Sequence, residues 1–266
     1  MHSEAHASAG VLWPLLILAM LAGPYAVAAL RQRRWSGWRT AGWMAGAVLA
    51  ALAFVPQLVA LAHHDLRAHM VQHLLLGMFA PLGLALGAPI TLALRTLPAP
   101  TARQIVGLLA SQPLRLLSHP VSALGLNSGG MYLLYLTPLY ELSLRSPALQ
   151  LALHAHFLAA GCLFTWAIIG LDPAPHRPPW PVRLAVLFAS IAAHATLGKM
   201  LYAFGLPRSA HGIEEIRAAA QLMYYGGDLA ELLLAIALFG QWYRARGRQL
   251  APTLPNAKGK ARAVDL

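Results

Sequence analysis

Histidine and aspartate side chains recur at helical spacing in one stretch of the sequence. His69 and His73 are four residues apart, and Asp65 precedes His69 by another four. Because an α-helix has about 3.6 residues per turn, these three side chains fall along one stripe of a helix. Two imidazoles at this spacing can chelate one transition metal, and a carboxylate can orient an imidazole through its other ring nitrogen. The pattern predicts a metal site, and polar residues at a helix mouth are the alternative.

Other histidines lie inside apolar segments, where burial of an ionisable group is unfavourable and marks a candidate functional residue. His154 and His156 are two residues apart, so one helix cannot turn both of them toward the same site. We expect His154 to face the site and His156 to lie at the lipid edge or the interface. His194 lies near the middle of another apolar segment, where a lone histidine is more often hydrogen-bonded structure than a ligand.

Acidic residues also lie inside the last apolar segment. Tyr224, Asp228 and Glu231 share one face of a helix there. Two carboxylates in an apolar helix require a cationic or metal partner. Lys199 is the obvious cation, so we expect it to pair with Asp228 across neighbouring helices. The alternative is that Asp228 binds a metal or orients a histidine.

The candidate metal ligands share an imidazole or a carboxylate and are Asp65, His69, His73, His154, His194 and Asp228. Imidazole suits copper and zinc, and we expect a copper ion. Methionine thioethers could add ligands for Cu(I), although methionine in membrane helices is usually a packing residue. The single cysteine, Cys162, excludes an intramolecular disulfide and a CxxC motif.

The elements that carry these residues are expected to be membrane helices. Of the 266 residues, 58% are hydrophobic and 11% are charged, against about 45–50% and about 25% in a soluble domain. A span needs about 20 apolar residues. The sequence therefore predicts an all-α, polytopic membrane bundle with about seven transmembrane helices, near residues 11–30, 43–62, 70–94, 121–142, 149–170, 184–204 and 219–243.

Charge predicts the orientation of this bundle. The net charge is +11, and the Lys and Arg residues gather in alternate loops and after residue 243, which is typical of cytoplasmic loops rather than of a nucleic-acid-binding surface. The opposite loops hold only Arg67, Arg145, Arg208 and Arg217. We therefore expect the N-terminus outside, the C-terminus in the cytoplasm, and the candidate ligands toward the outer helix ends.

Three further segments complete the expected organisation. Residues 1–10 are polar and should lie outside the membrane, before the seven-helix domain at 11–243. Residues 101–119 should form either an amphipathic helix on the cytoplasmic surface or a plain loop. Residues 244–266 are basic and polar, and we expect a disordered cytoplasmic tail.

Several motifs together resemble the CtaG-like cytochrome c oxidase assembly factors, the multi-pass family associated with caa-type oxidases. They are the run from His69 to Leu74, the stretch from His154 to Trp166, the Gly170-Leu-Asp-Pro173 turn and the run from His194 to Gly198. The resemblance covers about residues 43–242. It implies a multi-pass protein of the bacterial plasma (inner) membrane that is needed to mature haem–copper oxidase by delivering copper, without catalytic turnover. Its partners would be oxidase subunits, other copper chaperones and membrane lipid.

Two other functions stay open at this point. Paired histidines on facing helices could hold a haem in a membrane electron carrier. Alternatively, Lys199, Asp228 and Glu231 could line the pathway of a transporter or a proton channel. No G-x-S-x-G, H-E-x-x-H or P-loop motif occurs, which disfavours a hydrolase or a nucleotide-driven pump.

Overall fold

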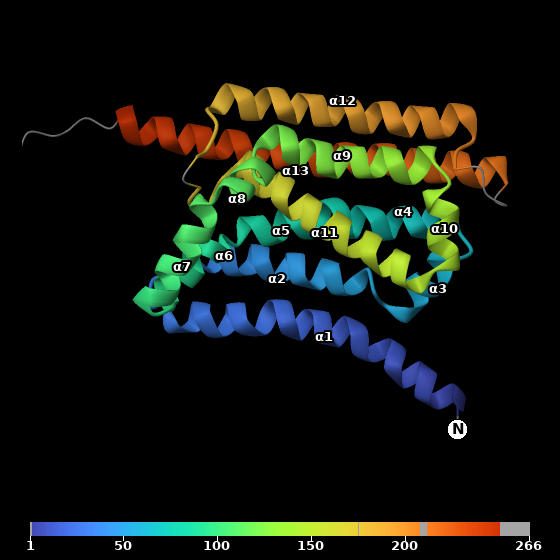
Figure 1. Cartoon of the computed structure of the whole chain (residues 1–266), viewed down its shortest axis with the longest axis horizontal. Coiled ribbons are helices and arrows are strands. Elements are labelled where there is room, and N and C mark those ends of the chain that lie inside the picture. Colours follow the sequence, from blue (N-terminus) through green and yellow to red (C-terminus); the bar gives the residue numbers. More distant parts are fainter. Residues whose placement is uncertain (1, 175, 208–211, 251–266) are drawn as a thin grey trace, which may run out of the picture.

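The protein is a bundle of helices in which no strand occurs among the residues described (Figure 1). A computed structural model describes residues 2–174, 176–207 and 212–250. Its elements are α1 (His2–Arg31), α2 (Gly37–Leu52), α3 (Pro56–Ala62), α4 (Leu66–Leu74), the π-helix η1 (Leu75–Phe79), α5 (Ala80–Leu86), α6 (Pro89–Thr96), α7 (Ala99–Ala110), α8 (Gln112–Leu117), α9 (Pro120–Leu136), α10 (Leu139–Arg145), α11 (Pro147–Ile169), α12 (Trp180–Phe204) and α13 (Ile213–Leu250).

Five helical stretches in the described chain are long and apolar enough to cross a membrane, and six if the bent α2–α3 pair is one span. The five are Leu12–Arg31, Leu66–Leu86, Pro147–Ile169, Trp180–Phe204 and Ile213–Gly247. The fold class predicted from the sequence is thus confirmed as an all-helical protein with several candidate spans. The fourth predicted span corresponds to α9, which has 17 residues, so the count of seven stays a prediction.

Prolines accompany breaks in three of the predicted spans. The second bends by 55° before Pro56, where α2 gives way to α3. The third does not run to residue 94 as expected, because Ala88 has a left-handed backbone (φ 48°) and Pro89 starts a separate helix, α6. The fourth ends at Leu136, just before Pro138, and α10 follows. Proline lacks an N–H donor and disfavours helix at the preceding residue, so each break follows from the local sequence.

The segment expected as a surface helix or a loop is helical. Helices α7 and α8 occupy it, and neither has a buried residue. Val106, Leu108, Leu116 and Leu117 are exposed on them, as expected for helices that rest on a lipid surface. At the C-terminus, α13 continues to Leu250, so the first part of the expected basic tail is helical. The rest of that tail, residues 251–266, lies outside the described residues.

Glycines allow the central helices to approach closely. A Cβ on Gly46 of α2 would lie 2.6 Å from the backbone nitrogen of Leu84, and a Cβ on Gly83 would lie 2.6 Å from the nitrogen of Gly46. Similarly, a Cβ on Gly161 of α11 would lie 2.3 Å from the carbonyl oxygen of Gly77 in η1. Small residues at helix crossings are the usual way in which membrane helices pack backbone to backbone.

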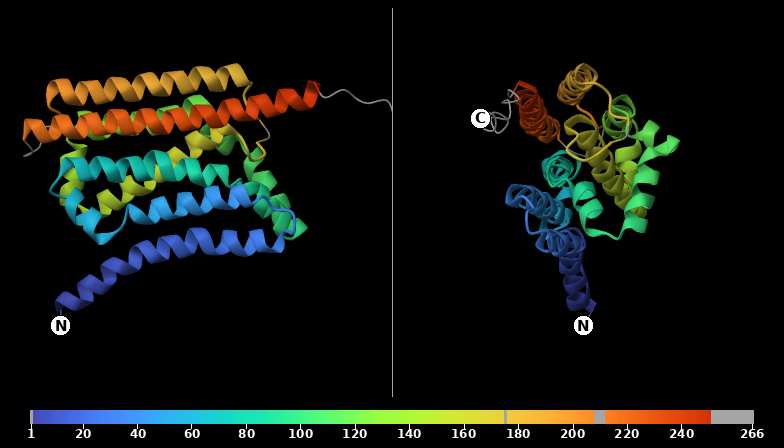
Figure 2. Two further views of the ribbon diagram at one scale, coloured as in Figure 1. Left: turned by 180° about the vertical axis from the view of Figure 1, so that it is seen from behind. Right: turned by 90° about the vertical axis from the view of Figure 1, so that its left-hand side faces the viewer.

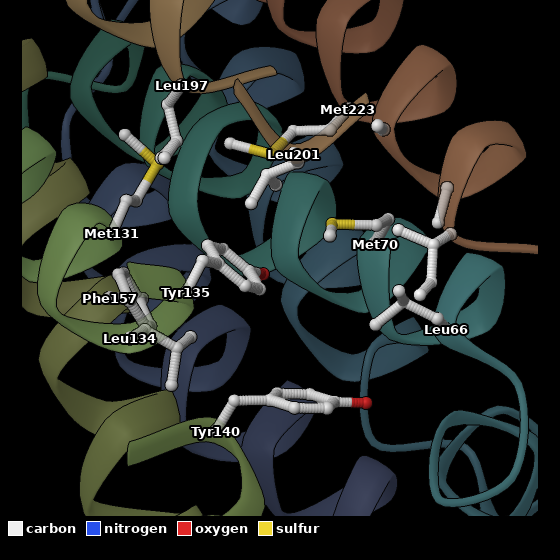
Figure 3. Packing of buried hydrophobic residues seen from close by; sticks show 13 residues of the cluster. Leu66, Met70, Met131, Leu134, Tyr135, Tyr140, Phe157, Leu197, Leu201 and Met223 are labelled. Carbon is white, nitrogen blue, oxygen red and sulfur yellow. The ribbon is translucent and has the colours of Figure 1, made fainter. Parts of the chain in front are cut away.

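The helix ends divide into two groups (Figures 1 and 2). The start of α1, α3, α10 and the start of α13 lie at one end of the bundle, and α6, α7, α8 and the end of α13 lie at the other. We call them the histidine end, after the histidines of α4 and α11 described below, and the basic end, after Arg95, Arg103 and Arg115 of α6, α7 and α8. At the histidine end, a buried cluster brings Tyr135 of α9 and Tyr140 of α10 together with Leu66 and Met70 of α4 (Figure 3).

Candidate functional site

Three histidines line one small cavity near the histidine end of the bundle. His69 and His73 come from α4, and His154 comes from α11. The cavity has a volume of about 20 Å³. That volume suffices for a water molecule or a single ion and leaves no room for a porphyrin ring. The structure thus brings together three of the six side chains predicted as metal ligands.

Aromatic rings hold the two histidines of α4. The Tyr135 hydroxyl is 3.2 Å from His69 Nε2, and the Tyr140 ring meets His69 edge to face at 4.9 Å between centroids. His73 is buried, and its ring stands at 89° to the ring of Phe157. In contrast to His69, His73 has an Nε2 atom that is buried without a hydrogen-bond partner. A buried nitrogen without a partner is unfavourable unless a ligand satisfies it.

His154 and His156 face different surroundings, as the two-residue spacing indicates. His154 lines the cavity, and its ring contacts Phe54 edge to face at 5.5 Å. The Nε2 atom of His156 is 3.1 Å from the carbonyl oxygen of Leu126 on α9. His156 therefore has a structural partner away from the cavity.

Sequence reasoning missed several residues of the cavity. Gln72 is buried, donates its Nε2 to the carbonyl oxygen of Ala53 at 2.7 Å, and leaves its Oε1 without a partner. Tyr135 and Tyr140, which contact His69 but do not line the cavity, were also missed, because aromatic residues in apolar helices carry no spacing signal. Gln72 did carry one, since an amide in an apolar segment must find a partner.

Asp65 lies outside this cavity. Its carboxylate caps the first turn of α4 by accepting the Arg67 backbone N–H at 2.8 Å, and it pairs with the Arg67 guanidinium at 2.6 Å. Hydrogen bonding by Arg67 lowers the pKa of Asp65 to about 2, so the group stays ionised at neutral pH. The structure therefore does not place Asp65 where it could orient His69.

His194 of α12 lines a second cavity with Glu231 of α13. His194 and Glu231 are 1% and 3% exposed, which makes them as buried as the apolar core. Both ring nitrogens of His194 and the Oε2 atom of Glu231 have no hydrogen-bond partner. Ser190 donates to Glu231 Oε1 at 3.4 Å.

The expected ion pair between Lys199 and Asp228 does not form. Within the described residues, the contact made by the Lys199 ammonium is with the ring of Tyr224, 5.7 Å from its centroid. The reason is helix rotation: Gly198 faces Tyr224 of α13, and Lys199 lies about 100° further around α12 and is exposed. Asp228 likewise follows Gly227, the residue that faces His194.

No three His, Cys, Asp or Glu side chains in the described chain are arranged so that they could hold a metal ion as they stand. The histidine cavity nevertheless offers suitable donors, namely three imidazoles, one of them with an unpartnered nitrogen, and the unpartnered amide oxygen of Gln72. These donors fit a borderline or soft metal ion if small side-chain movements bring the imidazoles together.

A different polar cluster lies at the basic end. Asp172, in the loop after α11, is 1% exposed. It accepts hydrogen bonds from the Thr91 N–H at 2.7 Å, the Thr91 hydroxyl at 2.6 Å and the Ile90 N–H at 3.2 Å. Burial raises the pKa of Asp172, and the hydrogen bonds from Thr91 oppose that shift. Asp172 thus caps α6 and ties the α11–α12 loop to it.

Comparison with known proteins assigns the family. A family model described as cytochrome c oxidase caa3 assembly factor matches residues 24–245. The chain belongs to this family. The family predicted from the motifs of α4, α11 and α12 is therefore confirmed.

Curated relatives of this family member come from mycobacteria. Uncharacterized proteins of Mycobacterium bovis and Mycobacterium tuberculosis are each 36% identical to it over 240 residues, covering 82% of this chain and 36% of the relative. An uncharacterized protein of Mycobacterium leprae is 31% identical over 243 residues, covering 83% of this chain and 37% of the relative. The chain thus spans little more than a third of the length of these relatives. No solved structure matches the chain.

Proposed function

We propose that this member of the caa3 assembly factor family binds copper at the extracytoplasmic face of the membrane and delivers it during maturation of haem–copper oxidase. His69, His73 and His154 would hold the ion. The observation that carries the proposal is that these three imidazoles, from α4 and α11, line one ion-sized cavity in which His73 Nε2 has no partner.

The surroundings of the cavity suit binding and release rather than turnover. A bound copper ion would supply a redox-active centre, and the chain would supply imidazole nitrogens, which suit copper. The ring of Tyr140 borders the partly buried His69, and the ring of Phe157 borders the buried His73. The Tyr135 hydroxyl is hydrogen-bonded to His69 Nε2. His69 would therefore bind the metal either through Nε2, after this hydrogen bond breaks, or through Nδ1. We therefore propose a carrier without catalytic activity.

Asp65 and Asp228 are not part of the proposed copper site. Asp65 is paired with Arg67, and Asp228 lines neither cavity. A site of neutral imidazoles without a carboxylate keeps the charge of its ion uncompensated, which favours a weakly held ion that can be passed on.

The proposed orientation is seven spans with the N-terminus outside and the C-terminus in the cytoplasm. Two observations support it. Helix α10, which supplies Ser143 to the lining of the histidine cavity, lies at one end of the bundle, and α6, α7, α8 and the end of α13 lie at the other (Figure 1). Basic loops are retained on the cytoplasmic side of a bacterial plasma membrane. The proposed partners are oxidase subunits, other copper chaperones and the surrounding lipid.

The test uses bacteria that lack the chromosomal copy of this chain and carry plasmid-encoded variants. His69→Ala, His73→Ala and His154→Ala should each lower caa3-type oxidase activity and the copper content of the oxidase, while the variant stays in the membrane. His64→Ala is the matched control, because His64 is an exposed histidine just before α4 and does not line the cavity. Normal oxidase copper in the His69/His73 double variant would contradict the proposal.

A further inference from the structure

The second cavity lies deeper in the bundle than the first. Its volume is about 20 Å³. His194 stands ten residues before the last residue of α12, which is about 15 Å along a helix and about half the thickness of a hydrocarbon core. Residues of η1, α5, α9, α11, α12 and α13 line the cavity, so it lies at the centre of the bundle.

Several potential ligand atoms around this cavity have no hydrogen-bond partner. His194 offers two ring nitrogens without a partner, and Glu231 offers an unpartnered Oε2. Met78 and Met131 line the same cavity and bring two thioethers. Hydrogen bonding within the chain therefore does not explain why a histidine and a glutamate are buried here.

The charges around the second cavity limit which ion could bind there. None of the described residues that line the cavity is Lys or Arg, so no basic side chain there compensates an ionised Glu231. An uncompensated carboxylate in an apolar interior is strongly unfavourable. A monovalent cation beside Glu231 gives a neutral site, whereas a divalent ion leaves one positive charge in the interior. Imidazole and thioether ligands, in turn, select soft ions such as Cu(I).

We infer that the second cavity binds one Cu(I) ion, with a His194 nitrogen and the Met78 and Met131 sulfurs as ligands and Glu231 as the counter-charge. This site is distinct from the cavity of His69, His73 and His154. The inference extends the proposed function, because it gives the chain two sites for the same metal. The second site lies deeper in the bundle than the first.

Two glycines connect and shape the pair of sites. Gly77 lines the second cavity, and a Cβ added there would lie 3.5 Å from the ring of His73, so the two cavities are neighbours. Gly227 makes room for the ligand: a Cβ at this position would lie 1.9 Å from His194 Cε1. The His194 ring therefore fits against α13 only because residue 227 has no side chain.

The experiment counts Cu(I) bound to the purified full-length chain under reducing, oxygen-free conditions, by competition with a chromophoric Cu(I) chelator. Wild-type protein should bind two Cu(I) ions. Glu231→Gln preserves shape and should weaken one site by on the order of ten-fold or more, and His194→Ala should abolish the same site. Met223→Leu is the matched control, because Met223 is a buried methionine of α13 that does not line the cavity.

X-ray absorption at the copper edge supplies a second readout that does not depend on stoichiometry. Sulfur scattering should be present in the wild type, persist in Met223→Leu and disappear in the Met78→Leu/Met131→Leu double variant. Two ions bound with unchanged affinity in Glu231→Gln and His194→Ala, or copper without sulfur ligands in the wild type, would overturn the inference.

The same measurement separates this inference from the proposed function. One Cu(I) in the wild type that is lost in His73→Ala and kept in His194→Ala would overturn the second site and leave the histidine cavity intact. A second site that responds to Glu231→Gln while His69→Ala and His73→Ala change neither copper binding nor oxidase copper would support this inference and contradict the proposed function.

Discussion

Two buried carboxylates in this bundle have opposite surroundings. Asp172, at the basic end, accepts three hydrogen bonds from Ile90 and Thr91 at 2.6–3.2 Å. Glu231, at the centre, receives one from Ser190 at 3.4 Å and has an oxygen with no partner. The two side chains are 1% and 3% exposed, so the difference is not one of burial.

The difference in hydrogen bonding between the two carboxylates indicates a difference in role. A buried polar group whose hydrogen bonds are all made stabilises one arrangement of the chain, and here Asp172 holds α6 against the α11–α12 loop. A buried polar group that lacks partners is unfavourable and is retained for another reason. The comparison therefore assigns Asp172 to the architecture and Glu231 to binding.

The largest effect that would test this comparison is on stability at the basic end. Asp172→Ala should lower the free energy of unfolding by about 3 kcal/mol, because it leaves the first turn of α6 and the Thr91 hydroxyl without an acceptor. Thr91→Val removes one of the three hydrogen bonds and should lower it by about 1 kcal/mol. Thermal unfolding of the detergent-purified variants measures both, and equal stability of Asp172→Ala and wild type would break the assignment.

A smaller effect of opposite sign is expected at the centre. Glu231→Leu removes an unsatisfied polar group from an apolar interior, so the apparent melting temperature should stay the same or rise. Copper-free protein must be used, because bound ligand would itself stabilise the wild type. If Glu231→Leu unfolds as readily as Asp172→Ala, then Glu231 is structural and the two carboxylates do not differ in role.

The sequence predicted the fold well and its interruptions poorly. Hydropathy locates membrane helices because every backbone group in lipid must bond within its own helix. A long apolar window is insensitive to single residues, however, so the spans predicted at residues 43–62 and 70–94 continue past the breaks at Pro56 and Pro89. Local proline rules should have outweighed apolar continuity at both positions.

The candidate site was predicted where spacing carries information. The i, i+4 pair of His69 and His73 lines one cavity, and His154 joins it from α11. No spacing rule could show that His194 belongs with Glu231 in a separate cavity, since that depends on how α12 and α13 are rotated. The rotation of α12 and α13 also explains why the prediction of an ion pair between Lys199 and Asp228 was wrong. Opposite charges do not determine which side of a helix faces its neighbour.

The smallest effect concerns these last two charges, which belong to neither of the compared regions. Lys199 is exposed with its ammonium near the Tyr224 ring, and Asp228 is half-buried beside Gly227. Lys199→Met and Asp228→Leu should therefore act independently, each changing stability by less than about 1 kcal/mol. Their double variant should equal the sum of the singles to within about 0.5 kcal/mol. Rescue in the double variant would show that the ion pair forms in the membrane. Asp228 would then be a carboxylate with a bonding partner, as Asp172 is, and would differ from Glu231 in the same way.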